Sequence, residues 1–91
     1  MKKLTVGETN LIAKYNLTDL AKRYSETPTL TVSNIFGGTA KLNEFGSKLY
    51  QNISSLYSRY ERGDMKVIQD YDRLRYLFLK FFPSEYMDLI D

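Results

Sequence analysis

The stretch Thr39–Glu61, TAKLNEFGSKLYQNISSLYSRYE, decides the fold, because large apolar side chains recur in it every three or four residues. The recurring positions are Leu42, Phe45, Leu49, Ile53, Leu56 and Tyr60. This spacing places them on one face of an α-helix. We therefore predict a helix over about 39–61 whose apolar face packs against the rest of the protein.

A second helical pattern follows after a very short connection. Its apolar positions are Val67, Ile68, Tyr71, Leu74, Phe78 and Phe81. Between the two patterns, Gly63 is suited to end one helix and Asp64 to begin the next. So short a loop favours antiparallel packing of the two helices. We expect a mostly α, small helical domain that is dominated by an antiparallel helix pair, about 39–61 and 65–82.

The first third of the chain gives weaker signals. Thr5 and Glu8 fit a capping box and predict a short helix to about Tyr15, with a short strand at Leu4–Val6 as the alternative. A second short helix runs to about Tyr24. Residues 27–36 alternate like a strand but also match a short helix, and both readings stay open. We expect a short helical or mixed α/β N-terminal part within a single domain, 1–91.

The residues that are missing exclude many kinds of chemistry. The 91 residues contain neither Cys nor His, so disulfides, thiolate or imidazole catalysis and the usual zinc sites are excluded. No pair of carboxylates stands out as an acid–base pair, and we predict a protein that is not an enzyme and binds no cofactor or metal.

The net charge is only +2. Neither a signal peptide nor a membrane span is recognisable, and we expect a cytoplasmic protein in a bacterium or an infected cell.

Aromatic side chains mark the candidate protein-binding surface. The strip Leu74–Phe82 is apolar nearly all round, and a helix of this kind is central in its fold or covered by a partner. The N-terminal third is one candidate cover, and a homodimer seam or a docking surface for another protein is the other. The residues we assign to protein binding are Tyr50, Tyr57, Tyr60, Tyr76, Leu79, Phe82 and Tyr86.

The C-terminal residues 84–91 alternate acidic and large apolar side chains. Such a segment can dock in a groove on a partner. We expect instead a last helical turn that Ser84 caps and that folds back on the core.

One part of the chain resembles helix-turn-helix DNA-binding proteins. Leu17–Tyr24, LTDLAKRY, is similar to their first helix, and Thr31–Phe36, TVSNIF, looks like the start of their recognition helix. The resemblance covers about 20 residues, and 27–40 hold no Lys or Arg. It implies DNA contacts by Lys22, Arg23, Ser33, Asn34 and Lys41.

We expect a small non-enzymatic inhibitor or adaptor that binds a host protein or nucleoprotein complex. Richness in Lys, Asn, Ile and Tyr is typical of AT-rich genomes, which suggests a phage or mobile element as the source. Blocking a defence nuclease, as anti-CRISPR proteins do, fits such a chain. A helix-turn-helix transcriptional regulator that binds DNA is the alternative.

Overall fold

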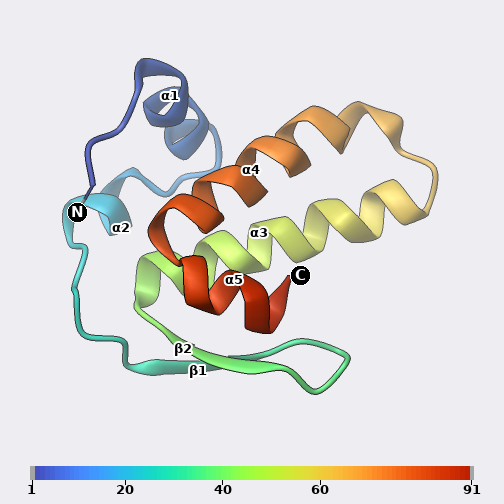
Figure 1. Cartoon of the computed structure of the whole chain (residues 1–91). Coiled ribbons are helices and arrows are strands. Elements are labelled where there is room, and N and C mark those ends of the chain that lie inside the picture. The colour runs from blue at the N-terminus through green and yellow to red at the C-terminus, as the bar shows by residue number, and fades with distance from the viewer. Residues whose placement is uncertain (1, 91) are drawn as a thin grey trace.

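Two antiparallel helices, α3 (Glu44–Glu61) and α4 (Ile68–Phe81), form the centre of the fold (Figure 1). The computed structural model describes residues 2–90. The other elements are α1 (Val6–Lys14), α2 (Thr18–Lys22), β1 (Leu30–Ser33), β2 (Thr39–Leu42), the 3₁₀ turn η1 (Met65–Val67) and α5 (Pro83–Leu89). The predicted mostly helical fold with its antiparallel helix pair is confirmed.

The start of the first long helix differs from the prediction. Residues 39–42 form β2, and α3 begins only at Glu44. The side chain of Asn43 accepts a hydrogen bond from the Gly46 N–H at 2.7 Å, which caps the helix at this point. Leu42 belongs to β2, and its side chain is fully buried. Its apolar character therefore fitted the helical spacing, although the residue is not part of the helix.

The loop between α3 and α4 follows the sequence signals. Gly63 adopts a φ of 97°, a left-handed conformation that glycine adopts readily. The side chain of Asp64 accepts a hydrogen bond from the Lys66 N–H at 3.1 Å and starts η1. Both predicted roles are confirmed, although the second helix opens with a 3₁₀ turn instead of a full α-helical one.

Residues 27–36 contain a strand rather than a helix. β1 pairs antiparallel with β2, and Val32 lies opposite Ala40 while Thr31 lies opposite Lys41. Val32 and Ala40 are half-buried against the helices, whereas Thr31 and Lys41 are exposed. This alternation is typical of a hairpin with one face on the core.

The core lies between the helix pair, the hairpin and the two terminal segments. Its most deeply buried large side chains are Phe45, Phe78, Leu17, Leu42, Leu49, Leu74 and Leu77. At one end of the core, Phe82 packs directly on Gly46, where a Cβ atom would approach the Phe82 Cζ to 2.7 Å. This glycine therefore permits the close approach of the chain that leads from α4 into α5.

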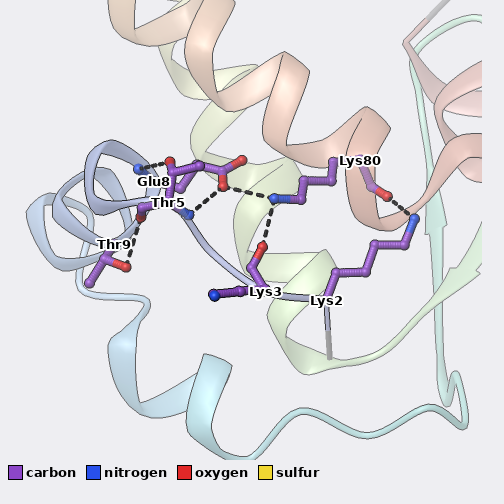
Figure 2. Close-up of polar contacts among 6 residues, drawn as sticks. All are labelled: Lys2, Lys3, Thr5, Glu8, Thr9 and Lys80. Carbon is purple, nitrogen blue, oxygen red and sulfur yellow. Dashed lines mark hydrogen bonds and ion pairs between the residues drawn. The ribbon is translucent and has the colours of Figure 1, made fainter.

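Polar contacts fasten the N-terminal segment to α4 (Figure 2). The Lys80 ammonium donates hydrogen bonds of 2.8 Å to the carbonyl oxygen of Lys3 and to Oε1 of Glu8. Lys2 in turn donates to the Lys80 carbonyl oxygen at 2.6 Å. Thr5 and Glu8 form the predicted capping box at the start of α1. These contacts hold α1 beside α4 in addition to the apolar packing of Leu11 and Ile12.

Residues 84–90 of the C-terminal segment fold back on the protein as expected, and Asp91 lies outside the described residues. Pro83 occupies the first turn of α5, where its missing N–H costs no hydrogen bond, and Ser84 is not the cap. Leu89 is buried in the core. The end of α5 thereby comes to lie against the hairpin.

Candidate functional site

The tip of the β1–β2 hairpin presents two large apolar side chains to solvent. Ile35 is 90% exposed and Phe36 is 89% exposed, although both follow a strand that packs on the core. Burial of such side chains contributes about 1.5–3 kcal/mol each, so their exposure forgoes a substantial stabilisation of the fold. The hairpin tip, residues 34–38, is therefore the most conspicuous candidate contact surface.

The side chain of Asn34 organises this tip. Its Oδ1 accepts hydrogen bonds from the N–H groups of Phe36 at 2.9 Å and Gly38 at 2.8 Å. The backbone N–H of Asn34 also donates to the Gly38 carbonyl at 2.9 Å. Gly37 has a φ of 88°, which favours glycine at that point of the turn. The conformation that exposes Ile35 and Phe36 is thus held by several hydrogen bonds within the turn.

The hairpin tip is also anchored to the end of α5. Asn34 Nδ2 donates to the carbonyl oxygens of Leu89 at 3.0 Å and Asp88 at 3.4 Å. Gly38 packs so closely that a Cβ there would lie 2.2 Å from the Asp88 carbonyl oxygen. The tip is therefore fixed relative to the helices and is not a free loop.

A groove of about 700 Å³ separates the hairpin tip from the helices. One wall consists of Ile35 and Phe36, and the end of α5 closes part of the rim. The floor is one face of α3, formed by Tyr50, Ile53, Ser54, Tyr57, Ser58 and Glu61. The two serines are small, which leaves space between the tyrosines. We call this feature the tip groove.

Tyr57 of α3 and Tyr71 of α4 both line the tip groove, and an arginine lies beside them outside the lining. The rings of Tyr57 and Tyr71 lie 5.7 Å apart, and the Arg75 guanidinium lies 5.2 Å from the centre of the Tyr71 ring. Arg75 Nη2 donates to the Tyr86 hydroxyl at 2.9 Å, which ties α4 to α5. Burial raises the pKa of Tyr71, so its hydroxyl stays neutral well above physiological pH. Tyr and Arg are the residues that dominate binding energy at protein interfaces.

The predicted protein-binding residues do not form one surface. Tyr57 and the half-buried Tyr50 both line the tip groove. Tyr86 of α5 does not line it, and its hydroxyl accepts a hydrogen bond from Arg75. Tyr60 is half-buried against the core, and Tyr76 and Leu79 are exposed on α4. Phe82 does not belong to any surface: it is only 7% exposed and packs against Phe45 and Phe78, which corrects the prediction.

A second hollow, of about 580 Å³, lies between α1 and α4 and contains Tyr76. Its lining includes Lys14 and Asp70, which pair with each other, and Glu8, which pairs with Lys80 of α4. Lys14 forms an ion pair with Asp70 and holds the pKa of that carboxyl below its usual value, with help from the Tyr15 hydroxyl. Burial, and then the hydrogen bond to Asp70, raises the pKa of Tyr15 to about 12. Glu8 has a lowered pKa because it accepts a hydrogen bond from Lys80. These pairs fasten α1 to α4.

The helix expected for DNA recognition is absent from its predicted place. Thr31–Ser33 belong to β1, and the side chain of Asn34 is engaged within the hairpin tip and with α5. The interpretation of 31–36 as the start of a recognition helix is therefore wrong. Residues 31–33 pair with β2 as a strand, and residues 34–36 belong to the hairpin tip. Ser33 and Lys41 are exposed on the hairpin, while Lys22 and Arg23 lie at the end of α2.

Sequence reasoning did not assign most of the groove lining to protein binding, including Ile35, Phe36, Tyr71, Glu61 and Asp88. A signal for the first two was present, since two large apolar residues stand directly before the Gly37-Gly38 turn. Nothing local indicated that Tyr71 would meet Tyr57, because that contact depends on how α3 and α4 pack.

Within residues 2–90, no group of three or more metal-ligating side chains comes together, and no helix has the length and apolar character to cross a membrane. Comparisons of the chain with protein-family models, with curated proteins and with solved structures give no match.

Proposed function

We propose that this protein is a non-enzymatic binding module, an inhibitor or adaptor that blocks a host complex, and that the tip groove is its contact site. The observation that carries the proposal is the pair Ile35 and Phe36, held exposed on an anchored turn. The proposed source is a phage or mobile element. The proposed partner is a host protein or nucleoprotein complex, such as a defence nuclease inhibited in an anti-CRISPR-like manner.

Rigidity of the hairpin tip supports a binding role. A loop that is already ordered loses little conformational entropy when it binds, so more of the contact energy contributes to affinity. Ile35 and Phe36 supply apolar area for the contact. The neighbouring Tyr57 and Tyr71 supply flat aromatic rings, whose burial against a partner is favourable. Together they form an apolar centre for an interface.

The mechanism we propose is steric. A segment of the partner packs in the tip groove against Ile35 and Phe36, and the tyrosines of the groove cover the adjoining surface and exclude water. The blocked complex then loses access to its own ligand or subunit. No group on this chain needs to react for such inhibition.

The test is an affinity pull-down from a low-GC bacterial lysate, split into nuclease-treated and untreated halves and read by mass spectrometry. We expect a host protein in stoichiometric amount in both halves. The double variant Ile35→Ser and Phe36→Ser loses this protein, with affinity lowered roughly 100-fold or more by the lost apolar burial. Val6→Ser is the matched control, since Val6 is 79% exposed on α1, away from the groove.

Two results would contradict the proposal. The first is capture that is equal for the wild type and for the folded tip double variant. The second is recovery of DNA, or of DNA-bound proteins, in the untreated half alone, which would support the DNA-binding alternative.

A further inference from the structure

The charges at the rim of the tip groove indicate what kind of segment it takes. Among the described residues that line it, the charged ones are Glu61 and Asp88, and both are acidic. The chain as a whole carries a net charge of +2, so the local sign is opposite to the overall one. Both carboxylates are exposed and available to a partner.

The two acidic residues come from different helices. Glu61 is in the last turn of α3, and Asp88 is near the end of α5, beside the hairpin tip. The carbonyl groups at the C-terminus of an 18-residue helix add negative partial charge near Glu61. The groove therefore combines an apolar and aromatic lining with two negative groups.

Nearby bases do not cancel this pattern. Arg59 of α3 is held by Asp64, with 2.8 Å between its Nη2 and the carboxylate oxygen Oδ2. Arg62 follows Glu61 at the end of α3 and is not part of the groove lining. Arg75 forms an ion pair with Asp72, with 3.3 Å between its Nη1 and the carboxylate oxygen Oδ1, so its charge is compensated outside the groove lining.

We infer that the tip groove binds a protein segment that carries one large aliphatic or aromatic anchor together with Lys or Arg residues. This inference rests on the proposed function and specifies its partner. The anchor packs against the apolar and aromatic lining, and the bases meet Glu61 and Asp88. The same acidic rim disfavours a nucleic acid in this groove, because phosphates would face two carboxylates.

The size of the groove sets the length of the segment. Its floor runs along α3 from Tyr50 to Glu61, which is about 16 Å at 1.5 Å per residue. About three turns of a helix or about five residues of a strand cover that distance. A short segment of a larger partner is therefore sufficient.

The experiment is selection of binders from an unbiased random-peptide display library on the immobilised full chain. A counter-selection on the immobilised variant with Ile35→Ser and Phe36→Ser removes the peptides that bind outside the tip groove. We expect the remaining peptides to share an apolar anchor together with Lys or Arg and to bind more weakly at high salt. Reversing both rim charges, Glu61→Lys with Asp88→Lys, should weaken them roughly tenfold and shift a repeated selection toward Asp and Glu.

The charge control is Asp19→Lys, which makes the same change on exposed α2 and should leave binding unchanged. Tip-dependent peptides without basic residues, or peptides indifferent to the rim reversal, would overturn this inference and leave the proposed function intact. Absence of any peptide that depends on Ile35 and Phe36 would count against both. A dimer in sedimentation experiments that the tip double variant abolishes would also overturn it, since a second copy would then fill the groove.

Discussion

Replacing Asn34 by Ala tests whether one side chain holds the hairpin tip in its binding conformation. Asn34 makes three side-chain hydrogen bonds of 3.0 Å or less, to the N–H groups of Phe36 and Gly38 and to the Leu89 carbonyl. The substitution removes all three and leaves their backbone partners to water. The turn then loses both its internal support and its attachment to α5.

The expected loss follows from these contacts. Hydrogen bonds of this kind contribute roughly 0.5–1.5 kcal/mol each, or about 3 kcal/mol for three. Water reaches part of this half-buried site, so we expect Asn34→Ala to lower the free energy of unfolding by about 2 kcal/mol. For a domain of this size, that corresponds to a fall in Tm of roughly 10 °C.

Urea unfolding measured by circular dichroism gives the stability, and amide hydrogen exchange reports on the turn. Exchange at Gly38 should accelerate more than exchange in α3, because its N–H donates to the Asn34 side chain. Asn34→Asp keeps both acceptor bonds and loses the donor to Leu89, so its effect should be smaller and confined to the α5 anchor.

Asn52→Ala is the matched control. Asn52 makes a single 3.0 Å bond to the Lys48 carbonyl on α3, and its replacement should change stability by less than about 0.5 kcal/mol. Equal losses for the Asn34 and Asn52 variants, or unchanged exchange at Gly38, would refute the role given to Asn34.

Two further predictions concern the frame that supports the site. Gly46→Ala should destabilise the protein by about 1 kcal/mol, since overpacking against Phe82 outweighs the better helix propensity of Ala. Gly7→Ala on α1 should stabilise the protein slightly, because the added Cβ would make only an ordinary 4.0 Å contact with the Thr5 hydroxyl. Urea midpoints that rise equally for both variants would contradict this. The lowered pKa values of Glu8 and Asp70 mean that their ion pairs stabilise the fold above the unfolded pKa values of 4.5 and 3.8 and lose this effect as the pH falls through the folded values. Urea midpoints at pH 6 and pH 3 measure this, and Glu8→Gln with Asp70→Asn should flatten the dependence; an unchanged slope in that variant would count against these pairs.

The helix pair could be predicted from the sequence because its information is local. Apolar residues at helical spacing, a glycine that ends one helix and an aspartate that starts the next are read within a few turns of chain. The capping box of Thr5 and Glu8 was predictable for the same reason. The absence of Cys and His likewise restricts the chemistry of the chain whatever its fold.

The tip groove was not predictable in this way, because its parts come from four separate segments. Residues 39–42 fit a helical pattern, and only pairing with β1 makes them a strand. Phe82 continued an aromatic strip, yet its packing on Gly46 buries it. The exposure of Ile35 and Phe36 depends on Asn34 reaching the end of α5, more than 50 residues away in sequence. By itself the sequence determined the helices and the excluded chemistries, whereas tertiary packing alone decided which aromatic and apolar side chains remain at the surface, since burial depends on contacts between distant segments.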